Sequence, residues 1–242
     1  QGVSFTDPPR DDMFNAPYYQ SCQKDLREAI DVIHGQGDVA SKRGRHSGGV
    51  YTYDVSPWVA GFVVGQPWLS HVVTGNNLLH PEMRSYQGNY MEVPSGNPTE
   101  IFLAQMINYT AEYEEGKYNW QHPVAFINSP TLDPMRHPTE STLLEEVSIR
   151  RAHGERLPTP TGPYDDDDGV SVDPTHLRAR KPFAAGYFSA YTVLPYYPDF
   201  LNHDPRYQAV RDSEGSNPFL GYLQDLKANH RGIPLVIADY GM

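Results

Sequence analysis

The carboxylate of Asp239 stands where an apolar strand is expected to end. Segment 234–242 reads PLVIADYGM, so an apolar run is followed directly by an acid and a glycine turn. A parallel α/β sheet presents reactive groups to a substrate from this position, at the carboxyl ends of its strands. An acid that only caps the following turn would give the same pattern. Asp239 is therefore a candidate catalytic carboxylate or a structural acid.

Two further segments place polar or aromatic groups after an apolar strand. Segment 58–68 (WVAGFVVGQPW) has an apolar run up to Gly65, followed by Gln66, Pro67 and Trp68. Segment 123–128 (PVAFIN) ends in Asn128. The amide of Asn128 could bind a polar ligand, and a turn-forming asparagine is equally compatible with the pattern.

The order of the expected elements predicts the architecture that positions these groups. We expect a strand end at 1–5, helices at 17–34, 98–115 and 217–230, and strands at 58–65, 123–128, 183–194 and 233–238. Alternation of this kind favours right-handed βαβ units and a parallel sheet in one domain, 1–242. Segment 72–97 is expected to be irregular. The long connection 129–182 is expected to cover or shape a site.

Composition excludes several classes of function. The net charge is -11, with 30 acidic and 19 basic residues and no basic stripe, so we expect no nucleic-acid partner. The single cysteine, Cys22, rules out an internal disulfide or a cysteine-based metal site, and the histidines show no pair at metal-ligand spacing on one helix. The acidic run 165–168 lacks the spacing of a calcium loop and is expected to be solvated. We predict no metal and no cofactor.

The sequence also indicates a soluble protein. No apolar run is long enough for a membrane span. The lone cysteine neither requires nor excludes an extracytoplasmic or cell-surface location, which is slightly favoured. The chain begins and ends at expected strand ends, so we expect further residues beyond one or both ends.

The residues at two strand ends resemble those of the retaining glycoside hydrolases with a TIM-type (β/α)8 barrel. In that superfamily strand four ends in an acid/base Glu and strand seven in a nucleophilic Glu. Gly65-Gln66-Pro67-Trp68 and Asp239-Tyr240-Gly241 fall at those places. Other stretches resemble an uncharacterised bacterial subgroup of these barrels, at 33–35, 54–58, 97–100, 130–134 and 195–200. The resemblance implies a β-linked glycan as ligand and an incomplete barrel in which strands three to seven are present.

This chain departs from the superfamily at both catalytic positions. Gln66 or Pro67 replaces the acid/base Glu, and neither can donate a proton to a leaving sugar oxygen. Asp239 replaces the nucleophilic Glu and is one methylene shorter, which matters because retaining hydrolases need carboxyl groups about 5–5.5 Å apart. Glu100 and Glu140 are the candidate substitute acids, although each also lies at an expected helix start, where an acid favours the helix dipole.

Aromatic residues near the strand ends complete the candidate site. Trp68, Tyr196 and Tyr197 could stack on a pyranose ring, or could pack in the core beneath the long loop. Gln66 and Asn128 could hydrogen-bond sugar hydroxyls. Two functions therefore remain open: a glycoside hydrolase-like enzyme that uses a carboxylate mechanism, and a barrel without catalysis that serves as a glycan-binding or scaffold module of a larger protein.

Overall fold

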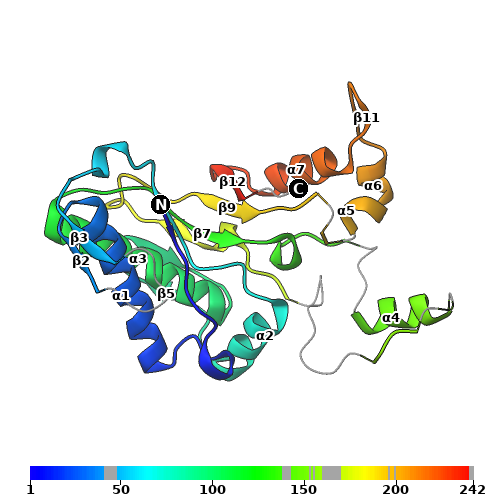
Figure 1. Ribbon diagram of the computed structural model, residues 1–242, viewed down its shortest axis with the longest axis horizontal. Coiled ribbons are helices and arrows are strands. Elements are labelled where there is room, and N and C mark those ends of the chain that lie inside the picture. The colour runs from blue at the N-terminus through cyan, green and yellow to red at the C-terminus, as the bar shows by residue number, and fades with distance from the viewer. Residues whose placement is uncertain are drawn as a thin grey trace.

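A parallel five-stranded sheet with helices packed against it forms the centre of the molecule (Figure 1). The computed structural model describes residues 1–242 except 41–47, 138–142, 153, 155, 160–169, 196, 199 and 240–242. The strands of the sheet are β1 (Gly2–Val3), β4 (Phe62–Val64), β7 (Val124–Asn128), β9 (Ser189–Thr192) and β12 (Leu235–Asp239). The α-helices are α1 (Ala16–Ile33), α2 (Ser70–Leu79), α3 (Pro98–Tyr118), α4 (Leu143–Ala152), α5 (Phe200–His203), α6 (Pro205–Gln208) and α7 (Pro218–Asn229).

Shorter elements lie in the connections. Three small antiparallel sheets are formed by β2 (Gly37–Val39) with β3 (Gly49–Tyr51), by β5 (Tyr86–Gln87) with β6 (Met91–Val93) and β8 (Arg178–Ala179), and by β10 (Arg211–Asp212) with β11 (Gly215–Ser216). Single 3-10 turns occur at Pro9–Asp11, Ser56–Trp58, Pro130–Leu132 and Pro174–His176.

The strands of the central sheet follow one another in chain order. The order across the sheet is β1-β4-β7-β9-β12, and every pairing is parallel. Val3 lies opposite Val64, and Val64 lies opposite Phe126. The predicted α/β architecture with a parallel sheet is therefore confirmed, and the order contains no reversal of direction across the sheet.

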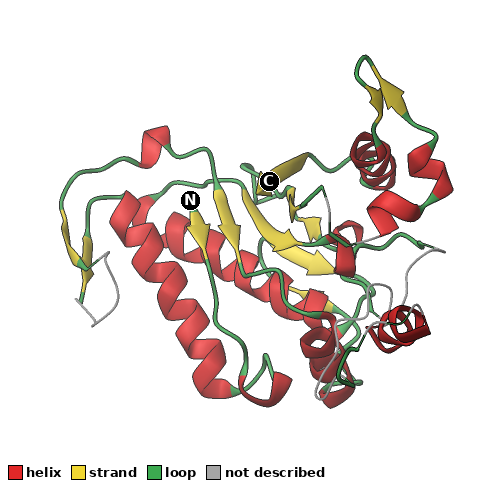
Figure 2. Cartoon of the chain, turned by 45° about the vertical axis from the view of Figure 1, so that its right-hand side comes forward, coloured by secondary structure: helices red, strands yellow, loops and turns green. Residues whose placement is uncertain are grey.

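Two long helices cover one face of the sheet. Figures 1 and 2 show α1 and α3 side by side against it. Helix α1 begins after Asn15, whose side chain accepts a hydrogen bond from the backbone N–H of Tyr18, and it buries one stripe of residues: Tyr18, Cys22, Leu26, Ile30 and Ile33. Helix α3 carries a full capping box at Asn97 and Glu100. In the described part of the chain no helix is both long and apolar enough to cross a membrane.

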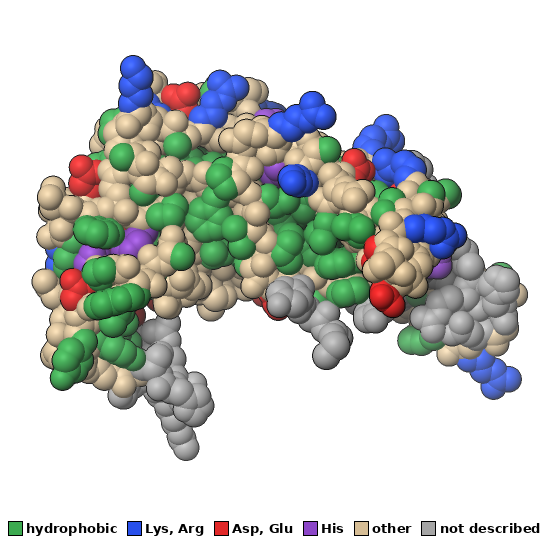
Figure 3. All heavy atoms as spheres, turned by 90° about the horizontal axis from the view of Figure 1, so that it is seen from above, with side chains coloured by type: hydrophobic (Ala, Val, Ile, Leu, Met, Phe, Trp, Pro, Cys, Tyr) green, Lys and Arg blue, Asp and Glu red, His purple; other side chains and the backbone are tan. Residues whose placement is uncertain are grey.

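The two faces of the sheet differ in how well they are covered. Phe62, Val64 and Phe126 are fully or almost fully buried in the main core with α1 and α3. Val63 and Ile127, which alternate with them, are only half-buried. Figure 3 shows hydrophobic side chains gathered across the middle of one face of the molecule. The sheet therefore packs helices on one side and leaves apolar side chains partly open on the other.

A second core lies under the last helices. It joins β9 to the region of α5, α6 and α7 through buried aromatic and aliphatic residues: Met135, Tyr191, Val193, Phe200, Leu201, Tyr207, Tyr222 and Leu226. Leu235 and Ile237 of β12 pack against this group.

Three boundaries differ from the sequence prediction. The expected strand 58–65 is reduced to Phe62–Val64, because Pro57 starts a 3-10 turn at Ser56–Trp58 that leaves Trp58 80 % exposed. The expected strand 183–194 is reduced to Ser189–Thr192, where it has pairing partners. Segment 72–97, expected to be irregular, contains most of α2 and the β5–β6 hairpin. The sequence of α2 contains several weak helix formers, so the pattern did not predict a helix. The buried side chain of Asn76 accepts a hydrogen bond from the backbone N–H of Met13 and fixes α2 in place.

Candidate functional site

A depression of about 450 Å³ lies at the carboxyl ends of the parallel strands. We call it the rim depression, and it is lined by residues 1–4, Val63, Gly65, Gln66, Pro67, Ile127, Ala238 and Asp239. Asp239 is exposed and lies opposite Thr192 of β9, just after an irregularity in the register at Ile237. The structure thus brings Gln66 and Asp239, the residues at the two resemblance positions, into the lining of one depression.

Gln66 is held by a carboxylate that the sequence analysis did not single out. The Nε2 of Gln66 donates a hydrogen bond to Oδ1 of Asp7 over 2.5 Å. Asp7 follows β1 and is exposed. No local pattern marks it, because it lies in a polar, proline-containing loop. This hydrogen bond directs the NH₂ group of Gln66 toward Asp7. The side-chain oxygen of Gln66 is the group that can accept a hydrogen bond from a ligand.

A second, smaller depression of about 180 Å³ adjoins the first and shares Pro67 with it. We call it the aromatic depression, and it is lined by Pro67, Trp68, Leu69, Ser129, Pro130, Thr131, Thr192, Leu194 and Tyr197. Tyr197 is 49 % exposed. Tyr196, its predicted partner in sugar stacking, lies outside the described residues.

Trp68 belongs mainly to the core. It is 3 % exposed, and its ring lies 6.4 Å from that of Phe5 and 6.2 Å from that of Phe102, measured between centroids. Gly65 adopts φ 88°, and a Cβ there would come within 3.3 Å of the indole. Of the two alternatives for Trp68, the structure shows core packing, with only an edge of the residue lining the aromatic depression.

Asn128 also points into the protein. It is 1 % exposed, and its Nδ2 donates to the carbonyl oxygen of Val172 over 2.9 Å and to the hydroxyl of Tyr191 over 3.1 Å. The amide therefore fixes the end of β7 against the chain at 172. Its donors are occupied by protein groups, so it offers no free N–H to a sugar.

Glu100 is a buried capping residue. It is 1 % exposed, its Oε2 accepts from the backbone N–H of Asn97 over 2.9 Å, and its Oε1 accepts from that of Asp173 over 2.8 Å. Oε2 also pairs with Nδ1 of His176 at 2.9 Å. Burial raises the pKa of Glu100, although these hydrogen bonds oppose the shift. Both carboxylate oxygens are thus used to hold segment 173–176 against the start of α3, which is the helix-start role considered for Glu100.

His176 completes this pair at the surface. Its side chain is 45 % exposed, and its Nε2 lies 3.6 Å from Oδ2 of Asp173. Burial would lower the pKa of His176, but the hydrogen bond and charge of Glu100 outweigh burial and raise it above its usual value.

The other predicted acid, Glu140, lies outside the described residues, as does the acidic run 165–168. The nearby residues that are described form a buried network instead. His137 pairs with Asp133, whose Oδ2 also accepts from the hydroxyl of Tyr222 over 2.8 Å. Burial raises the pKa of Asp133. This network ties the segment after β7 to α7.

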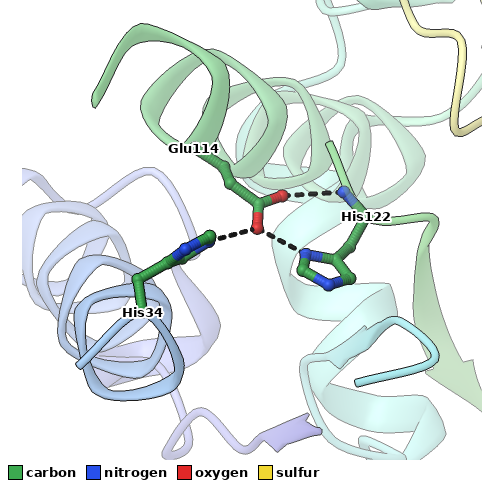
Figure 4. Close-up of side chains that lie close together, drawn as sticks. All are labelled: His34, Glu114 and His122. Carbon is green, nitrogen blue, oxygen red and sulfur yellow. Dashed lines mark hydrogen bonds and ion pairs between the residues drawn. The ribbon is translucent and has the colours of Figure 1, made fainter. Parts of the chain in front are cut away.

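One group of buried residues could hold a metal ion among the residues that the structure describes: His34, Glu114 and His122 (Figure 4). His34 caps the end of α1, Glu114 lies near the end of α3, and His122 precedes β7. Oε1 of Glu114 lies 2.9 Å from Nε2 of His34 and 2.5 Å from Nδ1 of His122. Burial would lower the pKa of His122, but its bonds to Glu114 and to the carbonyl of Ser56 raise it. The sequence prediction missed the group because its members lie on different elements.

No protein-family model matches this chain, and comparisons with curated proteins and with solved structures likewise gave no match. The chemistry of the rim therefore rests on the residues themselves. Asp239 offers an exposed carboxylate, Gln66 an amide and Tyr197 a half-exposed ring. The amide of Gln66 can accept or donate a hydrogen bond but cannot act as a general acid.

Proposed function

We propose that the central sheet is an arc of a TIM-type (β/α)8 barrel, comprising its third to seventh strands. A doubly wound sheet would reverse its strand order, whereas the order β1-β4-β7-β9-β12 runs in one direction. Within the described residues, no strand pairs with the outer edge of β1 or of β12. A depression lies beside each of these edge strands, about 280 Å³ between β1 and α1 and about 580 Å³ between β12 and α7. Further strand–helix units would fill these places.

We further propose that the chain binds a carbohydrate at the carboxyl ends of its strands. The observation that carries this proposal is the rim depression, which presents the amide of Gln66 and the carboxylate of Asp239 beside an apolar floor of Val63, Ile127 and Ala238. Amide and carboxylate groups suit sugar hydroxyls, and an exposed ring suits the C–H face of a pyranose. Tyr197 in the adjoining aromatic depression supplies such a ring.

Binding without hydrolysis is the function that the geometry supports best. A retaining hydrolase needs a proton donor opposite its nucleophile. Gln66 cannot serve, and both oxygens of Glu100 are occupied by Asn97, Asp173 and His176. The amide of Gln66, the carboxylate of Asp239 and the ring of Tyr197 are suited to binding a neutral glycan, which the negative charge of this protein does not repel.

A binding experiment tests this proposal. The 242-residue chain is titrated with a panel of β-linked oligosaccharides, and affinity is measured by isothermal calorimetry. Tyr197→Ala and Gln66→Ala are each expected to weaken binding about five- to thirtyfold, since each removes a contact worth about 1–2 kcal/mol. Trp58→Ala removes another exposed aromatic residue, which lies outside both depressions, and is the matched control. No binding by the parent, or equal binding by all variants, would contradict the proposal.

Hydrolysis is the second candidate, and the exposed carboxylate of Asp239 favours it. If it holds, the acid must come from another rim carboxylate, and Asp7 is the described acid that is hydrogen-bonded to Gln66. Parent, Asp239→Asn and Asp7→Asn are assayed on aryl glycosides. A hydrolase predicts activity in the parent and at least about a hundredfold loss in each variant. If the parent binds glycan but has no hydrolytic activity, hydrolysis is excluded and the binding function is retained.

A further inference from the structure

The buried group formed by His34, Glu114 and His122 has the composition of a metal centre. Two imidazoles and one carboxylate are the protein ligands of several zinc sites. Their ligand atoms all lie within 4.8 Å of one another, and the three side chains are between 0 % and 5 % exposed. Figure 4 shows the imidazoles of His34 and His122, from separate elements, both directed at one carboxylate oxygen of Glu114.

The atoms around the group fix its rings in the orientation that a metal ligand requires. The Nε2 of His122 lies 2.9 Å from the carbonyl oxygen of Ser56, and a carbonyl can only accept, so Nε2 carries the proton and Nδ1 faces Glu114. Ligating histidines commonly donate their second N–H to a backbone carbonyl in this way. The turn that carries this carbonyl is itself held, since the Ser56 N–H donates to Oδ1 of Asp54 over 2.9 Å.

The other two members are held by different contacts. The ring of His34 stacks on Tyr118 with centroids 3.9 Å apart and planes 6° apart. The second oxygen of Glu114, Oε2, accepts from the backbone N–H of His122 over 2.8 Å, so Oε1 is the oxygen presented to both rings. The two rings are thus oriented by Tyr118 and by the carbonyl of Ser56, and the carboxylate is oriented by the backbone of His122, as in sites built for an ion.

The ligand atoms are close enough together for one ion to reach all three, although two of their separations are shorter than in a zinc site. With bonds of about 2.0–2.1 Å, tetrahedral ligands lie about 3.3 Å apart. The distances from Oε1 of Glu114 to the two ring nitrogens are 2.9 Å and 2.5 Å. Both distances are shorter than the spacing in a zinc site, so the side chains would have to move apart to admit the ion.

We propose that His34, Glu114 and His122 bind a divalent cation, with zinc the best match to this donor set. The site lies at the amino ends of the strands, since its residues precede β4 and β7, and is thus at the opposite end from the rim depression. Residues at that end of such a sheet serve stability. The ion would join the ends of α1 and α3 to the start of β7, and it has no part in glycan binding.

The test begins with the parent chain, expressed without a histidine tag and freed of metal with a chelator. Zinc at about 100 times its Kd is expected to bind one ion per chain and to raise the Tm by about 5–10 °C. Glu114→Gln and His122→Asn are expected to lose both effects. His80→Asn is the matched control, because it removes a histidine that pairs instead with Asp12, and it should bind zinc as the parent does.

Two results would overturn the proposal: no zinc-dependent rise in Tm in the parent, or a rise that persists in Glu114→Gln and His122→Asn. If the variants do not fold, the X-ray absorption spectrum of the zinc-loaded parent decides. Two imidazole ligands are expected, and fewer than two would refute the assignment.

Discussion

The capping role assigned to Glu100 predicts that Glu100→Gln destabilises the protein substantially although it preserves the side chain's shape. In the parent, Oε2 accepts from the N–H of Asn97 and pairs with His176, while Oε1 accepts from the N–H of Asp173. Glutamine has one oxygen and one NH₂ group. In either orientation, the NH₂ group faces a backbone N–H, so one donor loses its acceptor.

The size of the effect follows from these contacts. A buried N–H left without an acceptor costs about 1–3 kcal/mol. Loss of the charge pair with His176 adds at most about 1 kcal/mol, because that ring is 45 % exposed and solvent screens the interaction. The expected loss is therefore about 1–4 kcal/mol of unfolding free energy. For a chain of this size that corresponds to a Tm lower by about 2–16 °C.

Calorimetry and urea denaturation of the 242-residue chain measure both quantities. Glu112→Gln is the matched control: it lies on the same helix, and its carboxylate accepts from Asn89 at the surface. Its unfolding free energy should stay within about 0.5 kcal/mol of the parent value. A Glu100→Gln variant as stable as the parent would refute the capping argument. If that variant also lost a glycosidase activity present in the parent, Glu100 would again be a candidate catalytic acid.

Three more predictions concern stability. Gly116→Ala should stabilise α3 by about 0.5–1 kcal/mol, because the added Cβ meets nothing within 4 Å. Gly96→Ala should destabilise the protein by about 1–3 kcal/mol, because its Cβ would collide with Glu100. Thermal unfolding of both variants measures this difference. Phe102→Ala should cost about 3–5 kcal/mol in urea denaturation, since the ring is fully buried among other aromatic rings, and a loss below about 1 kcal/mol would contradict the assigned core. The pKa of His176 is raised above 6.5, so its pairing stabilises the fold fully below that pH and is lost as the pH rises through the folded-state pKa. The unfolding free energy of the parent relative to that of His176→Asn should therefore fall by up to about 1 kcal/mol between pH 6 and 9. An increase of this free-energy difference with pH would refute the predicted direction.

Local sequence signals predicted the main elements of the fold. Pro98 and Glu100 mark the expected start of α3, and both lie in its first turn. The structure adds Asn97 as the cap and completes a capping box with Glu100. The wholly apolar segment before Asn128 forms the strand expected of it, and only Ile127 in this strand is less than fully buried. Helix α2 was missed because its sequence, SHVVTGNNLL, contains several weak helix formers whose tertiary contacts override propensity.

The candidate site was harder to predict, because its properties depend on contacts between distant segments. The pattern around Trp68 fits a core residue or a stacking surface, and only the neighbouring rings of Phe5 and Phe102 show core packing. No local sequence pattern distinguishes Asp7, and only its hydrogen bond to Gln66 associates it with the rim depression. His34 and Glu114 are likewise brought together by the packing of α1 against α3, which no spacing along the chain reveals.

The strand order has a further consequence for how the protein folds as it is synthesised. Among the five strands of the central sheet, each pairs only with the one that precedes it and the one that follows it along the chain. No strand must wait for a distant, later segment, so β1, β4 and β7 with α1 and α3 can pack before β9 and β12 leave the ribosome. The second core around Tyr191 and Tyr222 would then form last. The chain is thus suited to assembly from its amino-terminal end, one strand–helix unit at a time.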